Sequence, residues 1–281
     1  MATSRLLAGV IGDPVAHSRS PIMHNAAFAH HGINAQYERW HTPPAELAAR
    51  VATLRAPQYL GANVTLPHKV AVLELLDRID EQAAQIGAVN TIVREADGGL
   101  SGWNTDAPAI VATLQETAGF SVVGARVLLL GASGAARAAA FALGSAGAAR
   151  ITVVNRTLER AEGLLADLLA TLEHDPLLYA LASDDPDLAA AAADATLIIN
   201  ATSLGWREGE TPLAAGLIAP HALVLDLVDR ETQRWRDAVA RGARALDGLD
   251  MLVRQAALAF SYWTQQPPPV DVMRSAVSRL G

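Results

Sequence analysis

The segment VLLLGASGAAR, residues 127–137, joins a continuous apolar strand to a tight glycine turn and then to an alanine-rich helix. Backbone N–H groups at the start of such a helix, together with the helix dipole, favour a pyrophosphate group. The match to G-x-G-x-x-G is incomplete, because Gly131 alone occupies a motif position while Ser133 and Ala136 stand in the other two. The segment therefore predicts a nucleotide-binding turn, and a strand–turn–helix that binds no nucleotide is the alternative.

The next predicted strand ends at Asn155-Arg156-Thr157, about 20 residues beyond the glycine turn. A site that prefers NAD places Asp or Glu there to accept the ribose 2′-hydroxyl. This chain instead has Arg156, and Arg160 follows one helical turn later. Two guanidinium groups suit the 2′-phosphate of NADP, with each charge-assisted hydrogen bond worth about 1.5–3 kcal/mol. We therefore expect NADP(H) as cofactor, and the alternative is a pair of solvated surface arginines.

Strand and helix patterns alternate along the whole chain, which implies mostly parallel sheets in an α/β fold. Strands are predicted over residues 6–11, 35–40, 59–65, 88–94, 100–102, 126–130, 151–154, 196–199, 222–227 and 244–246. Helices are predicted over residues 20–31, 44–54, 67–76, 105–118, 133–146, 157–172, 183–195, 249–264 and 270–280. The length of 281 residues suits two domains of ordinary size.

Composition disfavours several classes of protein and site. The chain has no cysteine, which excludes disulfides, thiolate metal sites and a cysteine nucleophile. Its net charge of −7 disfavours a nucleic-acid partner. The sequence contains no run of about 18 apolar residues, so a membrane partner is not expected either. The histidines do not have the spacing of a metal site, so no metal is expected. A cytoplasmic protein is compatible with these features.

Lys69 and Asp106 are the candidate catalytic residues. Lys69 lies in the first turn of the helix predicted over 67–76, where its charge opposes the helix dipole, so a purely surface role is disfavoured. Asp106 is the only carboxylate between Gly102 and Ala109. Such a pair could pass a proton to a ring oxygen while hydride leaves a cofactor. The alternative is that these residues belong to ordinary caps and turns.

Two hydroxyl side chains precede the first predicted helix. Ser18 and Ser20 could bind a carboxylate at the N-terminus of that helix. For Ser20 taken alone we favour a structural role, with Ser20 at the N-cap and Pro21 at the first helical position.

Seven motifs stand in the order in which shikimate dehydrogenases have them. They are GDPVAHSRSP at 12–21, NVTLPHK at 63–69, GAVNT at 87–91, NTD at 104–106, NRT at 155–157, NATSLG at 200–205 and MLVxQ at 251–255, followed by Phe260 and Trp263. No single motif is decisive, but seven in the correct order are highly specific. From Val10 to about Thr264 the chain therefore resembles the shikimate dehydrogenase family.

The resemblance implies two α/β domains with a cleft between them. Residues 1–106 plus 247–281 would form a substrate domain, and residues 107–246 a Rossmann-like NADP domain. The implied reaction is the NADPH-dependent, reversible reduction of 3-dehydroshikimate to shikimate in aromatic amino-acid and chorismate biosynthesis. The expected partner is this small-molecule substrate, and a homodimer is an option that the sequence leaves open.

The resemblance also assigns roles to residues. It implies that Lys69 and Asp106 are the catalytic pair. The implied substrate contacts are Ser18, Ser20, Asn63, Thr65, Asn90 and Gln255. The implied cofactor contacts are Gly131, Ala132, Ser133, Gly134, Ala135, Asn155, Arg156, Thr157, Arg160, Thr202, Ser203, Leu227, Gly248 and Glu81.

The chain departs from the family pattern at three positions. Ser133 stands where the family usually has a second glycine, although a serine could still donate to phosphate, and Trp206 stands where it usually has methionine. Asp229 stands where the family has a tyrosine that is expected to touch the substrate, and the loop after it is shorter. An aspartate near a substrate carboxylate would repel it, unless the shorter loop turns it away. We therefore hypothesise weaker substrate affinity or a different preferred ring acid.

Two alternatives to shikimate dehydrogenase are kept. The first is a quinate/shikimate or amino-shikimate dehydrogenase, although Arg156 argues against an NAD-linked enzyme. The second is a non-catalytic protein that binds NADP and a ligand on the same fold. The presence of both Lys69 and Asp106 argues against this second alternative.

Overall fold

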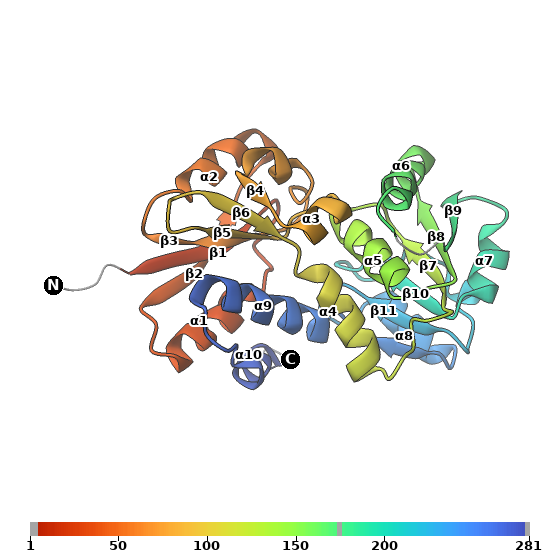
Figure 1. Ribbon diagram of the computed structural model, residues 1–281. Coiled ribbons are helices and arrows are strands. Elements are labelled where there is room, and N and C mark those ends of the chain that lie inside the picture. The colour runs from red at the N-terminus through yellow and green to blue at the C-terminus, as the bar shows by residue number, and fades with distance from the viewer. Residues whose placement is uncertain (1–4, 173–175, 279–281) are drawn as a thin grey trace. The chain divides into compact units, whose positions relative to one another are not determined.

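The computed structural model describes residues 5–172 and 176–278, which divide into two compact units (Figure 1). Unit 1 consists of Met1–Asp106 and Leu252–Gly281, and unit 2 consists of Ala107–Met251. Each unit is built on one six-stranded sheet, so the α/β class predicted from the alternating pattern is confirmed.

The sheet of unit 1 has the order β2-β1-β3-β5-β6-β4. Its strands are β1 (Leu6–Gly12), β2 (Ala35–His41), β3 (Tyr59–Val64), β4 (Arg78–Ile79), β5 (Thr91–Arg94) and β6 (Leu100–Trp103). Strand β1 pairs in parallel with β2 and β3, and β4 pairs in parallel with β6. Strand β5 is antiparallel to both of its neighbours, because the short turn between β5 and β6 reverses the chain.

Helices cover both faces of this sheet, with α1 and α2 on opposite sides (Figure 1). The helical segments of unit 1 are α1 (Ser20–His30), the 3-10 helix Pro44–Glu46, α2 (Leu47–Thr53), the 3-10 helix Ala71–Leu75, α3 (Glu81–Ile86), most of α9 (Leu249–Thr264) and α10 (Val270–Ser278). The predicted end of the last helix at residue 280 lies outside the described residues. Helix α3 was not predicted, although Asp80 caps its start through the N–H groups of Gln82 and Ala83.

All six strands of unit 2 are parallel, in the order β12-β11-β10-β7-β8-β9. They are β7 (Arg126–Leu130), β8 (Arg150–Asn155), β9 (Leu177–Ala182), β10 (Leu197–Asn200), β11 (Leu223–Asp226) and β12 (Arg244–Leu246). The chain adds strands in one direction from β7 to β9 and then in the other from β10 to β12. In open sheets of this kind, ligands bind beyond the carboxyl ends of the strands at this reversal.

The helices of unit 2 connect these strands. They are α4 (Asp106–Ala112), which starts at the unit boundary, the π-helix Thr113–Thr117, α5 (Gly134–Ser145), α6 (Leu158–Leu169), α7 (Leu188–Asp194), the 3-10 helix Ala215–Leu217 and α8 (Gln233–Ala240). Strand β9 and helix α8 were not predicted. Apolar side chains from β7, β10 and β11 form the buried core, among them Leu128, Ile198 and Val224.

Two local predictions in unit 1 are wrong. The helix predicted over 67–76 is a series of turns followed by the 3-10 helix Ala71–Leu75, because the Lys69 carbonyl accepts the Val89 N–H at 2.8 Å and the Leu73 N–H donates to the Val70 carbonyl instead. Ser20 is not the N-cap of α1. The helix begins at Ser20 with Arg19 at the N-cap, and Ser18 Oγ accepts the Ser20 N–H at 3.3 Å.

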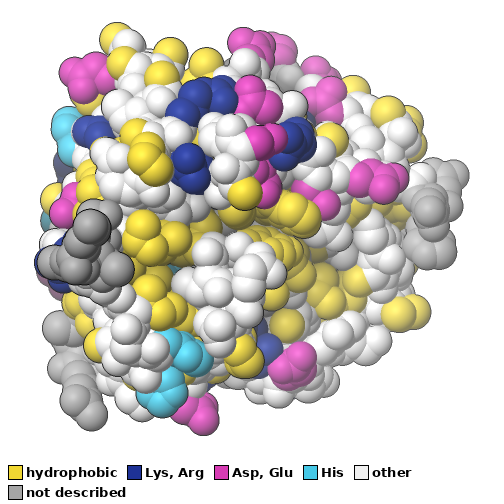
Figure 2. All heavy atoms as spheres, turned by 60° about the vertical axis from the view of Figure 1, so that its left-hand side comes forward, with side chains coloured by type: hydrophobic (Ala, Val, Ile, Leu, Met, Phe, Trp, Pro, Cys, Tyr) yellow, Lys and Arg dark blue, Asp and Glu magenta, His cyan; other side chains and the backbone are white. Residues whose placement is uncertain are grey.

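The surface charges and the length of the helices relate to the two classes of partner that the sequence disfavours, nucleic acid and membrane. On the face in Figure 2, Lys and Arg side chains lie among Asp and Glu side chains and do not gather into a basic patch. Two ion pairs of this mixed kind in unit 1 are Arg55–Asp77 and Arg78–Asp97. None of the helices in the described part of the chain is long and apolar enough to cross a membrane.

Candidate active site

Lys69 and Asp106 form an ion pair in unit 1. Lys69 Nζ donates to Asp106 Oδ2 at 2.5 Å, with side-chain exposures of 15% and 5%. Lys69 comes from the turn after β3, and Asp106 is the first residue of α4. The turn is held on both sides, because His68 Nε2 lies 2.6 Å from the Thr42 carbonyl and Val89 donates to the Lys69 carbonyl. Lys69 therefore contacts Asp106 but does not lie at the start of a helix. The prediction that its charge opposes a helix dipole is wrong.

Lys69 is also the only lysine in the sequence, among 22 lysines and arginines. This signal is visible in the sequence and strengthens the assignment. An arginine stays protonated in proteins, whereas a lysine can release its proton. The one position at which this chain uses lysine is the position that pairs with a buried aspartate.

The second oxygen of Asp106 is held by an amide. Asn90 Nδ2 donates to Asp106 Oδ1 at 2.7 Å and to Thr105 Oγ1 at 2.9 Å. Asn104 accepts the Asp106 N–H through Oδ1 and donates to the Ala88 carbonyl at 2.8 Å. The carboxylate thus receives a donor on each oxygen, which suits an ionised aspartate because it only accepts hydrogen bonds.

Asn63 lies near the end of β3, and Thr65 directly follows the strand. Asn63 accepts the Tyr37 hydroxyl at 2.8 Å and donates to Thr91 Oγ1 at 3.0 Å and to the Asn90 carbonyl at 3.3 Å. Thr65 contacts Gly12, where a Cβ would lie 2.4 Å from Thr65 Cγ2. The loop that contains Ser18 and Ser20 therefore begins beside the turn that contains Lys69.

That loop is tied to the end of β2. Arg39 donates from Nε and Nη2 to the Ser18 carbonyl at 3.0 and 2.7 Å. His41 Nε2 lies 2.7 Å from Asp13 Oδ1. The Ser20 side chain is buried and hydrogen-bonds to Tyr37, whose pKa burial raises well above its usual value. Tyr37 thus links Ser20 to Asn63, and sequence reasoning missed it because it lies inside an ordinary alternating strand.

The two remaining predicted residues of unit 1 lie on helices. Gln255 is buried on α9, where Nε2 donates to the Leu252 carbonyl at 2.8 Å. Glu81 is exposed as the first residue of α3. Within residues 5–172 and 176–278, neither side chain forms a hydrogen bond with Lys69 or Asp106.

The glycine turn after β7 has a positive backbone φ and little space for a side chain. Gly131 adopts φ +105°, and a Cβ there would lie 3.0 Å from the Ala201 carbonyl oxygen. Ser133 caps α5 by accepting the Ala136 N–H at 3.3 Å, and it donates to the Ala201 carbonyl at 2.9 Å. The serine proton is therefore engaged within the protein, so anion binding falls to the backbone N–H groups at the start of α5.

The predicted 2′-phosphate residues follow β8. Asn155 donates to the Thr157 carbonyl at 2.8 Å, and Thr157 is the N-cap of α6. Arg156 and Arg160 are exposed. Within residues 5–172 and 176–278, no ion pair engages either guanidinium. Two cations without a carboxylate partner fit an anionic ligand such as the 2′-phosphate of NADP.

The loops after β10, β11 and β12 contain four further predicted cofactor residues. Asn200 Oδ1 accepts Thr202 N and Oγ1 at 3.0 and 2.7 Å, and the Asn200 carbonyl accepts the Leu227 N–H. Gly248 donates to the Val228 carbonyl, and a Cβ there would lie 2.6 Å from the Leu227 oxygen. Ser203 is exposed next to Thr202.

Buried Asp226 joins these loops. It accepts from Asn200 Nδ2 at 2.9 Å, from the Val228 N–H at 3.1 Å and from Thr232 Oγ1 at 2.6 Å. Burial raises its pKa, and these donors oppose the rise. Neither Asn200 nor Asp226 was singled out from the sequence, because their roles are to hold neighbouring loops.

Two of the departures from the family pattern fall on these same loops. The Arg230 guanidinium lies 4.3 Å from the centroid of the Trp206 ring, a cation–π contact between the loop after β10 and the loop after β11. Asp229 is partly buried beside Arg230 in sequence. The two loops are therefore linked by a contact that involves Trp206, one of the departures from the family pattern.

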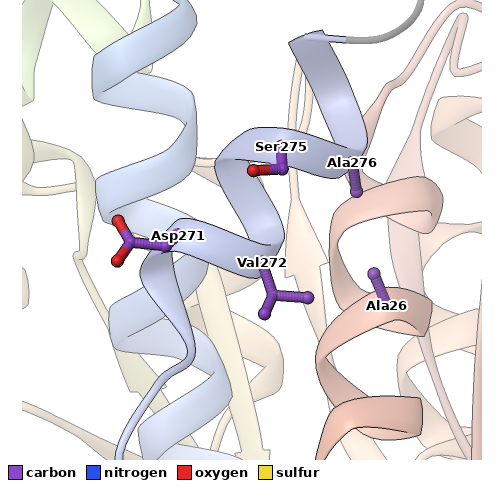
Figure 3. Close-up of a pocket in the computed structure, with 5 residues that line it drawn as sticks. All are labelled: Ala26, Asp271, Val272, Ser275 and Ala276. Atoms are coloured by element: carbon purple, nitrogen blue, oxygen red, sulfur yellow. The ribbon is translucent and has the colours of Figure 1, made fainter.

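Other features of the described chain do not add to the site. No group of three or more His, Asp or Glu residues in the described ranges could hold a metal ion. A pocket of about 400 Å³ lies between α1 and α10, lined by Ala26, Asp271, Val272, Ser275 and Ala276 (Figure 3). None of the predicted site residues lines it.

Comparisons with known proteins show the family of the chain. Three family models match the chain: the shikimate dehydrogenase substrate binding domain over residues 10–92, shikimate / quinate 5-dehydrogenase over 113–204, and the shikimate 5′-dehydrogenase C-terminal domain over 248–277. The chain is 46% identical over 276 residues to shikimate dehydrogenase (NADP(+)) of Symbiobacterium thermophilum, covering 96% of this chain and 92% of the relative.

Two solved structures are similar over almost the whole chain. One is shikimate 5-dehydrogenase from Thermus thermophilus in complex with NADP(H) and shikimate, 39% identical with a TM-score of 0.84, covering 98% of this chain and 99% of that one. The other is quinate dehydrogenase from Corynebacterium glutamicum in complex with NAD, 30% identical with a TM-score of 0.86, covering 99% and 100%. From its seven ordered motifs, its paired Lys69 and Asp106, and these similarities, the chain belongs to the shikimate dehydrogenase family.

Proposed function

We propose that Lys69 and Asp106 transfer the proton in the reversible, NADP(H)-dependent reduction of 3-dehydroshikimate to shikimate, the activity of the family to which the chain belongs. The observation that supports this assignment is the 2.5 Å contact between Lys69 Nζ and Asp106 Oδ2, with Asn90 on the other carboxylate oxygen. In this proposal unit 1 binds the ring acid, and unit 2 binds NADP(H).

The ammonium of Lys69 has the donors that the reaction needs. NADPH, when bound, supplies the hydride. The ketone oxygen gains negative charge as it is reduced and requires a proton. Asp106 takes one of the three N–H groups of Lys69, so the others are available to that oxygen. The proton passes from Lys69 Nζ to the oxygen on reduction and returns on oxidation, while Asp106 keeps the ammonium in place.

The remaining polar residues of unit 1 recognise the ring acid. Ser18 and Ser20 bind its carboxylate, and the Arg39 guanidinium on the Ser18 carbonyl adds positive charge there. Asn63 has both amide protons engaged, so it offers a ring hydroxyl only the acceptor Oδ1. Asn90, the other proposed amide contact, has both amide protons engaged and an Oδ1 that already accepts from Thr91 and Thr105, so a ring hydroxyl would have to share that oxygen. Thr65 and Gln255 complete the set of proposed contacts.

The cofactor residues divide by the part of NADP(H) that each would bind. The turn from Gly131 to Ala135, with Ala132, Ser133 and Gly134, contacts the pyrophosphate. The segment from Asn155 to Arg160, with Arg156 and Thr157, contacts the 2′-phosphate ribose. Thr202, Ser203, Leu227 and Gly248 lie at the nicotinamide end, and Glu81 is a further contact from unit 1.

Substitution of Lys69 by two different residues tests the proton-transfer role. Lys69→Ala removes both charge and proton, and we expect kcat for shikimate oxidation to fall about 10²–10⁴-fold. Lys69→Arg keeps a cation that can reach Asp106 but does not release a proton at neutral pH. We expect it to be nearly as inactive as Lys69→Ala. An arginine variant with substantial turnover would show that Lys69 acts through its charge alone.

Steady-state kinetics on shikimate, quinate and amino-shikimate with NADP⁺ and NAD⁺ test the substrate and cofactor. We expect the highest kcat/KM for shikimate with NADP⁺. A higher kcat/KM for quinate with NAD⁺ would favour a quinate dehydrogenase instead. Ligand binding without turnover on any of these acids would favour a non-catalytic binding protein.

The cellular setting is part of the same proposal. The absence of cysteine is compatible with a reducing cytoplasm, and we propose that the enzyme works there. The sequence leaves open whether the enzyme forms a homodimer, and sedimentation equilibrium tests this. Cell fractionation tests the compartment.

A further inference from the structure

A chain of buried polar side chains runs from β2 to the proposed catalytic pair. Its members are Tyr37, Asn63, Thr91, Asn90 and Asp106, none more than 6% exposed. Buried polar groups are costly unless they are hydrogen-bonded. Two of the five, Tyr37 and Thr91, have no role in the proposed function. Both are buried and hydrogen-bonded to residues that have such a role.

Along this series of side chains, from Tyr37 to Asp106, every hydrogen bond is donated toward Asp106. The Tyr37 hydroxyl donates to Asn63 Oδ1 at 2.8 Å, so the amide of Asn63 turns its Nδ2 toward Thr91 Oγ1 at 3.0 Å. A hydroxyl has one proton, and that of Thr91 goes to Asn90 Oδ1 at 3.1 Å. The amide of Asn90 is thereby turned so that Nδ2 meets Asp106 Oδ1 at 2.7 Å.

The orientation of Asn90 matters for the carboxylate. If this amide were reversed, its oxygen would face Asp106, and two acceptors would oppose each other in a buried site. Three donors keep Asn90 Oδ1 on the far side: the Thr91 hydroxyl, the Thr105 N–H at 2.8 Å and the Thr105 hydroxyl at 3.2 Å. Of these, the Thr91 hydroxyl is the donor that also connects Asn90 to Asn63, and it can be removed by substitution.

We propose that Tyr37 and Thr91 are positioning residues, whose hydroxyl groups fix the amides of Asn63 and Asn90 and thereby hold Asp106 against Lys69. This inference rests on the proposed roles of Lys69 and Asp106. Neither hydroxyl needs to touch the substrate, because each acts through an amide. Their effect is on the geometry of the pair, and an error of about 1 Å in the placement of a reacting group can cost on the order of 100-fold in rate.

Near-isosteric substitutions isolate the hydroxyl groups. Thr91→Val keeps the shape of the side chain and removes its hydrogen bonds, whereas Thr91→Ser keeps the hydroxyl. Tyr37→Phe keeps the ring, which stacks on His24 with centroids 4.3 Å apart. Thr196→Val is the matched control in unit 2, since it removes a hydroxyl whose hydrogen bonds within the described residues go to the backbone of Arg126, the first residue of β7.

Kinetics on the purified full-length enzyme, with shikimate and NADP⁺, test the proposal. For Thr91→Val we expect kcat to fall about 10- to 100-fold while KM for NADP⁺ stays within about twofold, and we expect Thr91→Ser to recover most of kcat. Tyr37→Phe should lower kcat in the same way but less, because it acts one amide further from Asp106. Thr196→Val should match the wild type.

A spectroscopic readout supplements the kinetics. Lysine labelled with ¹³C and ¹⁵N marks a single residue, because Lys69 is the only lysine. We expect its side-chain signals to shift in Thr91→Val and to return in Thr91→Ser.

Several outcomes would overturn the proposal. Unchanged kcat in both Thr91→Val and Tyr37→Phe would do so, as would a Thr91→Ser variant no better than Thr91→Val. If Thr91→Val does not fold, Tyr37→Phe alone decides. Full turnover in Lys69→Ala would instead overturn the proposed function, and this result is distinguishable because it concerns a different variant.

Discussion

The buried side chain of His24 leads us to predict that the free energy of unfolding of unit 1 falls at acidic pH. Its ring is fully buried on α1, stacked on Tyr37 and 5.1 Å from the Trp263 ring centroid. Burial lowers the pKa of His24 from 6.5 to about 3, weakly opposed by the Asn63 side chain. The native state therefore keeps a neutral imidazole at pH values where the unfolded chain binds a proton.

The sign and size of the effect follow from linkage. Between about pH 6.5 and pH 3 the unfolded state binds the additional proton, so the free energy of unfolding falls as the pH falls. At about pH 5 the loss attributable to His24 is about 2 kcal/mol relative to about pH 7.5, and it approaches about 5 kcal/mol near pH 3. Replacement by a side chain that does not titrate should remove this loss.

Urea unfolding at about pH 5 and about pH 7.5 measures the loss in wild type, His24→Phe and His24→Leu. We expect both variants to lose about 2 kcal/mol less than the wild type between the two pH values, whatever their stability at neutral pH. His221→Gln, which replaces an exposed histidine, is the control and should behave as the wild type. Equal losses in the wild type and both His24 variants would refute the argument that a buried neutral imidazole is responsible.

Three further predictions concern the cofactor and the substrate. Arg156→Ala should raise KM for NADP⁺ about 10- to 100-fold and leave NAD⁺ kinetics unchanged, because about 1.5–3 kcal/mol of charge-assisted hydrogen bonding is lost; equal effects on both cofactors would argue against a 2′-phosphate contact. Gly131→Ala should weaken NADP⁺ binding at least tenfold in calorimetry, since its φ of +105° and a 3.0 Å approach to the Ala201 oxygen disfavour a Cβ; wild-type affinity would show that the turn can adjust. Asp229→Tyr should lower KM for shikimate in steady-state assays, because it removes a charge that repels the carboxylate. If the wild type saturates with shikimate as its relatives do and Asp229→Tyr leaves KM unchanged, the Asp229 side chain points away from the substrate.

Much of the fold could be predicted from local sequence. Strand β7 and helix α9 have the predicted bounds, because a continuous apolar run and a long amphipathic period are strong local signals. The cofactor turn was likewise recognisable from Gly131 and from the arginine after β8. The shortest and most exposed elements, β4 and β9, were missed because few of their side chains are buried and their pattern is weak.

The residues around Lys69 show where local rules fail. A proline followed by apolar residues predicts a helix, but the backbone carbonyl of Lys69 is paired with Val89 from a distant segment. A long-range hydrogen bond of this kind has no signature within the helix-sized window that a prediction uses. The prediction that Lys69 matters was therefore made partly for the wrong reason, since its partner is the Asp106 carboxylate and not a helix dipole.

The sequence by itself determined the α/β class, the glycine turn after β7, the expectation of a 2′-phosphorylated cofactor from Arg156, and the identity of the polar residues at strand ends. These features depend on residue type and short-range spacing, which the chain carries without folding. Only the tertiary structure decided which of those polar groups meet. Tyr37 and Thr91 lie 54 positions apart in the sequence. They join one series of hydrogen bonds because β2, β3 and β5 belong to the same sheet and Asn63, near the end of β3, is paired with Thr91 at the start of the antiparallel β5.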